Sequence, residues 1–207
     1  MNKAHLKTAL TTAFAFFAAL TVTSCGTENS YSNICKDMAA VKFQNHTICV
    51  SHDYYMVKGI RTPVDMPTAR QIAKDKKMIL PTSEIVDAIW QQADIRLKPI
   101  PLTPGPQMTG RAYYIRHNDL INDQLSQYDT KDKLIAGHKK DIVYISPQSS
   151  RVAIYGWHRL NGQPIQPYST VHGRYYYDYS HGLRLVSPIA YDSENNPVDL
   201  KKILERG

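Results

Sequence analysis

The chain has 207 residues, of which 43% are hydrophobic and 21% charged, and its formal net charge is +7. This length and composition suit one domain with a sizeable core. Its basic residues occur only singly or in short groups, which argues against a nucleic-acid partner. The positive charge suits an anionic cell-wall polymer or a membrane surface as partner, and it is equally typical of an ordinary protein surface.

The first residues have the pattern of an export signal. Lys3 and Lys7 precede an uncharged apolar run at 8–22, which is too short to span a bilayer comfortably. The run ends in Val-Thr-Ser-Cys at Cys25, which resembles a bacterial lipobox. That resemblance implies cleavage after residue 24 and lipidation of Cys25; an ordinary cleaved signal peptide is the alternative.

These patterns divide the chain into a lipoprotein signal peptide at 1–24, a small polar tether at 25–33 and a single domain at 34–207. The expected location is outside the cytoplasm, with the protein lipid-anchored to the cell envelope at the outer membrane or the periplasmic face. No second hydrophobic segment follows, so we expect membrane contact through the lipid anchor only.

A lipidated Cys25 leaves Cys35 and Cys49 as an even pair. Export places them in an oxidising compartment, so we predict a structural disulfide between them. Cys49 belongs to an apolar run at 47–50 that faces a second run at 41–43 across a polar turn, and this pattern predicts a hairpin.

Helices are predicted in the next part of the chain. Residues 67–73 carry apolar side chains on one face, and Thr82 suits the N-cap of a second helix with an apolar stripe as far as Ala93. Four prolines at 99–106 predict an extended connector, and a third helix is expected at 112–128.

Strand patterns dominate after residue 134. β-Branched and aromatic runs at 142–145 and 151–155 predict neighbouring antiparallel strands, and Asn161–Gly162 predicts a tight hairpin. Further strands are expected at 175–179 and 183–186, and a closing helix at 198–204. The predicted fold class is α+β, with N-terminal helices packed on a C-terminal antiparallel β-sheet.

Residues 137–186 concentrate the groups that transfer protons near neutral pH or bind a borderline metal. Isolated histidines of this kind often serve only the structure, but six such groups in fifty residues favour a site. We predict that the six share one cleft with aromatic walls from Tyr155, Trp157 and residues 175–177. The predicted catalytic residues are His138, Asp141, His158, His172, Asp178 and His181.

One hypothesis for this site is a zinc centre with His172, Asp178 and His181 as ligands. The order Ser169, His172, Asp178 is similar to the motif of zinc peptidases that cut cell-wall stem peptides, although both spacings differ by one residue and the HxH pair of that family is missing. The resemblance implies a possible zinc cofactor.

The other hypothesis is metal-free acid/base chemistry. Asp141 would orient His138, or Asp178 would orient His181, to give a general base. A nucleophile would come from Ser169 or Ser180, and an anionic substrate would contact Lys139 or Lys140.

The segments LPTSEIVDAIW, RHNDLI, GHKKDIV, YGWHRLNGQPIQP and DYSHGLRLV resemble uncharacterised bacterial exported proteins, over about residues 50–187. The site and the compartment together predict a hydrolase of the cell envelope, acting on peptidoglycan or another extracellular polymer. The rival prediction is a non-catalytic lipoprotein that binds or assembles the envelope.

Overall fold

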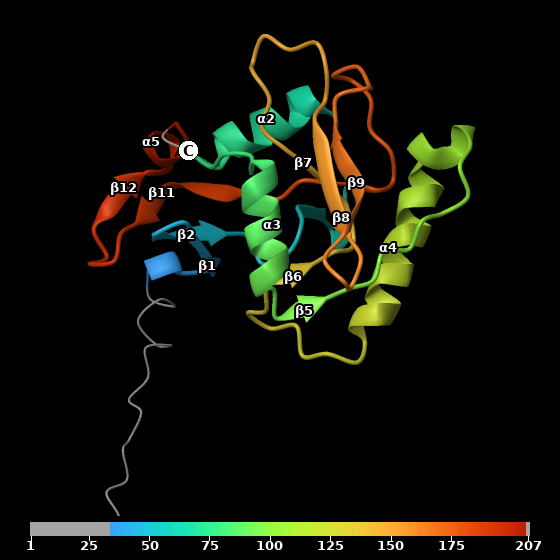
Figure 1. The fold of residues 1–207 in the computed structure, drawn as a ribbon. Coiled ribbons are helices and arrows are strands. Elements are labelled where there is room, and N and C mark those ends of the chain that lie inside the picture. The colour runs from blue at the N-terminus through green and yellow to red at the C-terminus, as the bar shows by residue number, and fades with distance from the viewer. Residues whose placement is uncertain (1–33, 206–207) are drawn as a thin grey trace, which may run out of the picture.

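A computed structural model describes residues 34–205, shown in Figure 1. The predicted signal peptide, the whole predicted tether with Cys25, and the last two residues lie outside the described part. Within it, no helix is long and apolar enough to cross a membrane.

One antiparallel sheet joins the two ends of the described chain. Its strands are β1 (Ala39–Phe43), β2 (His46–Val50), β11 (Val186–Tyr191) and β12 (Pro197–Asp199), in the order β1-β2-β11-β12. The predicted hairpin is confirmed, because β1 and β2 pair with Phe43 opposite His46. As a result, segments from the two ends of the domain lie side by side (Figure 1).

The second sheet carries the predicted site region. Its order is β10-β7-β8-β9, with β7 (Lys140–Ile142), β8 (Ile154–His158), β9 (Pro164–Ser169) and β10 (His181–Gly182). The antiparallel pairing of β7 with β8 and the hairpin at Asn161–Gly162 are as predicted. The strand bounds differ, because the predicted runs at 142–145 and 151–155 are in these strands only at Ile142 and at Ile154–Tyr155. Strand β10 runs parallel to β7, which the sequence pattern did not indicate.

Further helices and two small sheets complete the fold of residues 34–205. The helices are α2 (Met66–Asp75), α3 (Ser83–Gln92), α4 (Arg111–Leu125) and α5 (Leu200–Leu204), and a 3-10 turn spans Pro106–Thr109. The small sheets pair β3 (Met56–Val57) with β4 (Ile60–Arg61) and β5 (Ile95–Arg96) with β6 (Ile135–Ala136). The α+β fold class is therefore confirmed, with the helices mostly between N-terminal and C-terminal strands.

Helix α3 connects the two larger sheets. The Thr82 hydroxyl accepts from the Ile85 N–H, which confirms the predicted N-cap. Ile85 and Ile89 are buried with residues of the first sheet, while Val86 packs against Val143 and Ala153 beside the second.

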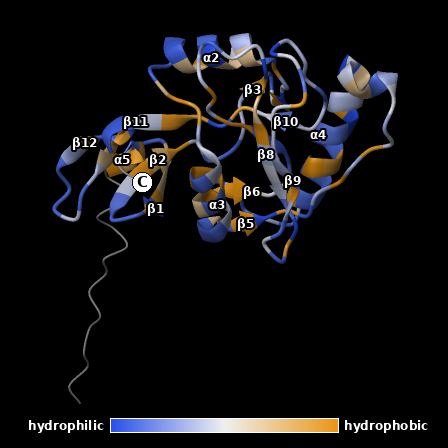
Figure 2. Ribbon diagram, turned by 45° about the horizontal axis from the view of Figure 1, so that its top comes forward, coloured by the Kyte–Doolittle hydropathy of each residue, from blue (hydrophilic) through white to orange (hydrophobic). Residues whose placement is uncertain are grey.

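Figure 2 shows the contrast between the hydrophobic strand β6 in the interior and the largely hydrophilic helix α2 at the edge.

Two predicted strands are corrected by the structure. Residues 175–179 lie in two turns joined by irregular backbone, because the Tyr176 N–H bonds back to the Gly173 carbonyl and the Asp178 side chain accepts from the Ser180 N–H. Of residues 183–186, only Val186 is in a strand. Leu183 and Leu185 instead accept backbone bonds from the loop at 51–55.

The edge of the first sheet has a side-chain partner. The Gln92 amide accepts from the Lys42 N–H at 2.8 Å and donates to the Lys42 carbonyl at 2.8 Å. Since Lys42 lies in edge strand β1, the side chain of Gln92 occupies the place where the backbone of another strand would pair.

The predicted disulfide is present and joins Cys35, just before β1, to Cys49 in β2, with a sequence separation of 14. Changing both cysteines to alanine is expected to lower the free energy of unfolding by about 3 kcal/mol, because the unfolded chain regains the entropy of a loop of roughly 15 residues. Urea unfolding of the oxidised protein and of the double variant measures the difference. Wild-type protein under reductant is the control and should match the variant; equal midpoints for oxidised and variant protein would contradict the prediction.

Candidate active site

Three of the predicted residues gather around Tyr176. The ring of His172 stacks on Tyr176 with centroids 3.9 Å apart, and the ring of His181 lies edge-on to it at 5.8 Å. The Tyr176 hydroxyl donates to Asp178 Oδ2 at 3.2 Å. Because His172 is exposed, Tyr176 half-buried, and Asp178 and His181 buried, this Tyr176 group runs from the surface into the interior.

Asp178 is held as a carboxylate by its neighbours. It accepts from both the backbone N–H and the hydroxyl of Ser180, and the Lys140 ammonium lies 4.0 Å from its Oδ2. Burial alone would raise its pKa, but His181, the Ser180 bonds and Lys140 hold the pKa of Asp178 below its usual value.

His181 is the most unusual residue of the group. Its side chain is fully buried, and in the described part of the chain neither ring nitrogen has a hydrogen-bond partner. The β10–β7 register places it opposite Lys140. Burial lowers the pKa of His181 to about 4 against the opposing effect of Asp178. At neutral pH the imidazole is therefore uncharged and retains a nitrogen that can accept a proton.

His138 and Asp141 form a second group but do not bond to each other, in contrast to the hypothesis that Asp141 orients His138. His138 Nε2 lies 3.0 Å from Asp53 Oδ1, and Asp53 also pairs with Arg61 at 2.6 Å. Burial lowers the pKa of His138 to about 4. Although burial would raise the pKa of Asp53, His138 and Arg61 hold it well below its usual range.

Asp141 has partners of its own. It accepts from the Tyr54 hydroxyl at 2.8 Å, and its other oxygen lies 3.6 Å from Arg184 Nε. Burial raises the pKa of Asp141 to about 6, despite the Arg184 guanidinium. Its pairing partners therefore stabilise a carboxyl that burial makes costly to ionise.

His158 belongs to a third group. Its Nε2 lies 2.8 Å from Asp87 Oδ1 of helix α3, and its ring stacks on Trp90 with centroids 5.5 Å apart. Asp141 and His158 both line an internal cavity, but its volume of about 10 Å³ is too small for a substrate. The prediction of one cleft for all six residues is thus corrected to three groups, because each side chain outside the Tyr176 group has a separate carboxylate, hydroxyl or guanidinium partner.

Lys139 and His117 lie together in the interior. Lys139 donates to the Tyr179 carbonyl at 2.7 Å and lies 3.5 Å from His117 Nδ1. Burial lowers the pKa of Lys139 to about 7, and burial together with Lys139 lowers the pKa of His117 to about 2. His117 packs edge-on against Trp157 and Tyr179, as expected for a helix-packing histidine.

Several members of these groups were not identified from the sequence. They are Asp53, Tyr54, Arg61, Asp87 and Arg184. Arg184 alone carries a local signal, since a charged residue inside the apolar run at 183–186 suggests a buried pair. The other four lie in the first half of the chain and reach the site only through the tertiary fold.

Zinc binding is not established by the arrangement. In residues 34–205, no group of three or more His, Cys, Asp or Glu side chains is arranged to hold a metal ion. Asp178 already accepts bonds from Ser180 and Tyr176. Zinc bound by His172, Asp178 and His181 therefore stays a prediction.

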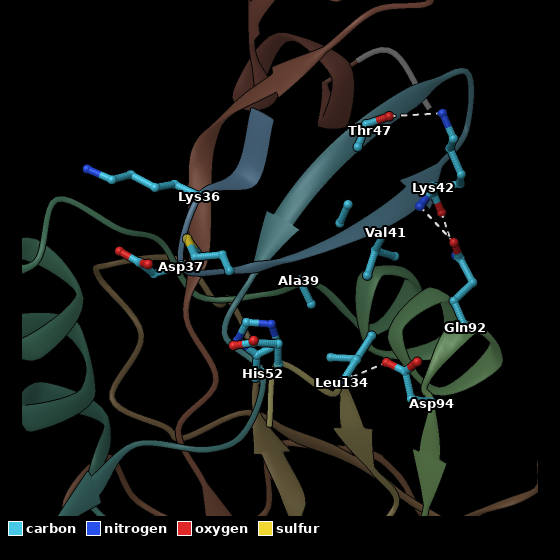
Figure 3. Close-up of a pocket in the computed structure, with 13 residues that line it drawn as sticks. Lys36, Asp37, Ala39, Val41, Lys42, Thr47, His52, Gln92, Asp94 and Leu134 are labelled. Atoms are coloured by element: carbon cyan, nitrogen blue, oxygen red, sulfur yellow. Dashed lines mark hydrogen bonds between the residues drawn. The ribbon is translucent and has the colours of Figure 1, made fainter. Parts of the chain in front are cut away.

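A larger cavity, with a volume of about 880 Å³, lies elsewhere, between β1 and the end of α3 (Figure 3). Lys36 and Asp37 lie at one side in the view, Lys42 and Gln92 at the other, and His52 between them. None of the six predicted catalytic residues lines it.

No known protein family, curated protein or solved structure matches this chain. The resemblance to uncharacterised exported proteins stays a prediction, and function has to be argued from the sites themselves.

Proposed function

We propose that this protein is an exported hydrolase of a cell-envelope polymer, peptidoglycan before other glycans, with Asp178 and His181 as its acid/base centre. The observation that supports this most is the imidazole of His181, buried with two unpartnered nitrogens beside a carboxylate. A buried polar group without a partner is costly, so its retention favours a role beyond structure.

In the proposed reaction, neutral His181 takes a proton from the water that attacks the scissile bond, and the imidazolium then gives this proton to the leaving group as the bond breaks. Asp178 stabilises the imidazolium that forms, and the Lys140 ammonium, whose side chain is partly exposed, faces negative charge developing on the substrate. Because His181 is fully buried, substrate reaches it only after Tyr176 and His172 move aside.

The compartment part of the proposal depends on the first 25 residues. A signal peptide and a lipid on Cys25 would place the domain at the envelope, where a basic protein meets anionic polymer. Mass spectrometry of the protein from a bacterial host tests this part directly. A mature N-terminus other than an acylated Cys25 would contradict the lipid anchor.

The hydrolase proposal is tested with full-length protein in detergent and isolated peptidoglycan, with soluble fragments measured by mass spectrometry. His181→Asn is expected to lower fragment release by about 100-fold or more, because a general base contributes at least that factor. His52→Asn, outside the Tyr176 group, is the matched control. Metal analysis and activity after chelation decide whether zinc takes part. Unchanged release by a folded His181→Asn protein would refute the proposal.

A second candidate function is non-catalytic binding of the polymer. Exposed tyrosines favour it: Tyr144, Tyr168 and Tyr175 are 57%, 51% and 71% exposed, and such rings suit contact with sugars. In that case wild-type protein would sediment with peptidoglycan without releasing fragments. Tyr168→Ala and Tyr175→Ala would then weaken sedimentation, whereas His181→Asn would not.

A further inference from the structure

A separate pocket of about 260 Å³ lies between helix α3 and the β8–β9 hairpin. Its walls come from Asp87, Trp90, Gln91, Tyr155, His158, Asn161, Gly162 and Pro164. The hairpin tip fixes one wall: Gly162 has a φ of +88°, and a Cβ at this position would lie 3.1 Å from the Trp90 ring. The tight turn therefore holds the pocket in a defined shape.

Asp87 is the charged group of this pocket. Its side chain is 42% exposed, so part of the carboxylate faces the open space. Its Oδ1 accepts from the Tyr155 hydroxyl at 2.9 Å and lies 2.8 Å from His158 Nε2. Two donors from strand β8 thus fix the carboxylate in one orientation.

These donors orient Asp87 without neutralising it. Burial lowers the pKa of His158 and raises the pKa of Tyr155 to about 12, so both are uncharged at neutral pH. Neither lysine nor arginine is present among the residues that line the pocket. The negative charge of the carboxylate therefore faces the pocket without a cation from its walls.

We propose that this pocket binds a primary ammonium group of the envelope polymer, carried by a diamino acid or by an amino sugar. The carboxylate of Asp87 receives the ammonium, and the ring of Tyr155, whose hydroxyl bonds to the same carboxylate, adds an aromatic surface beside it. Side-chain amides of Gln91 and Asn161 offer oxygen atoms to neighbouring polar groups. The volume is below that of typical drug-sized ligand pockets, which fits one small group rather than a long segment.

This inference takes only the identity of the polymer from the proposed function; the ammonium site is independent of the Tyr176 group. The test uses full-length protein and calorimetric titration with four probes. Two are muropeptides with a free or an N-acetylated diamino-acid amine, and two are glucosamine and N-acetylglucosamine. Tighter binding of one free amine than of the other identifies its source.

Wild-type protein is expected to bind at least one free-amine probe roughly tenfold tighter than its acetylated form, because acetylation removes the positive charge that the Asp87 carboxylate would receive. Asp87→Asn should abolish this preference, and Tyr155→Phe, which keeps the carboxylate, should preserve it. Asp94→Asn is the matched control because its side chain is 44% exposed and lies outside this pocket. Circular dichroism confirms that each variant is folded.

Equal binding of free and acetylated probes, or an unchanged preference in Asp87→Asn, would overturn the inference. Its failure is distinct from failure of the hydrolase proposal. If His181→Asn releases fragments normally while Asp87→Asn loses ammonium binding, the hydrolase proposal falls and the ammonium site stands. If the reverse holds, the hydrolase stands without this site.

Discussion

Replacing Arg184 by methionine is expected to lower the free energy of unfolding by about 3–5 kcal/mol, the cost of leaving a buried charge without its partner. Arg184 is fully buried and donates to the carbonyls of Ser51 and Ile135 at 2.8 and 2.7 Å. Its Nε lies 3.6 Å from Asp141. The substitution would remove the Arg184 donors from two carbonyls and leave the Asp141 carboxylate with only the Tyr54 hydroxyl, where the loop after β2 meets β6.

Guanidinium unfolding of the wild type and of Arg184→Met measures this loss. The double variant Arg184→Met with Asp141→Leu should recover part of it, because the unpaired carboxylate is removed. Lys201→Met is the surface control: its ion pair with Glu205 joins side chains that are 79% and 63% exposed, so little change is expected. An Arg184→Met protein as stable as the wild type would show that the guanidinium bonds contribute little net stability.

Acidification is expected to destabilise the protein between pH 6.5 and pH 4. Burial lowers the folded-state pKa of His138 and of His181 to about 4, against 6.5 for an ordinary histidine. Below pH 6.5 the unfolded state therefore binds protons that the folded state does not, and each histidine removes on the order of 3 kcal/mol by pH 4. His117, with a pKa near 2, acts in the same direction.

One group acts against this trend. Burial raises the folded-state pKa of Asp141 to about 6, so the folded state binds that proton first and gains stability as the pH falls from 6 toward 4. The net loss is therefore smaller than the sum over the histidines. Below about pH 4 the depressed pKa of Asp53 adds a further loss, since its contribution disappears as the carboxylate is protonated.

Free energies of unfolding at pH 7, 6, 5 and 4 test this expectation. Asp141→Asn should steepen the decline, whereas His181→Asn should flatten it, so the two variants give effects of opposite sign. A stability that is constant over this range in all three proteins would contradict it.

The elements predicted best are those with strong local signals. Thr82 starts α3 because its hydroxyl has a defined N–H to accept, and Asn161–Gly162 forms its hairpin because glycine tolerates a positive φ. Residues 175–179 have a strand-like composition, yet they lie in turns and irregular backbone because Asp178 bonds to Ser180. A local side-chain bond of this kind competes with strand pairing and is not visible in an apolar pattern.

The site residues also divide into those that a local pattern predicted and those that only the tertiary fold brings together. The sequence indicated that His172, Asp178 and His181 belong together. The structure gathers them around Tyr176 because they are close in the chain and the backbone between them turns. Asp53 and Asp87, the carboxylates that orient His138 and His158, lie 85 and 71 residues away in the chain. Such partners are set by the packing of α3 and of the loop after β2, which no local spacing encodes.

The contact of Gln92 with Lys42 has a consequence for association between molecules. An exposed edge strand offers free N–H and carbonyl groups that can template pairing with another chain. In β1 the amide of Gln92 blocks both groups of Lys42. Where two copies of this protein meet, the Gln92 side chain therefore opposes edge-to-edge pairing of β1 at Lys42.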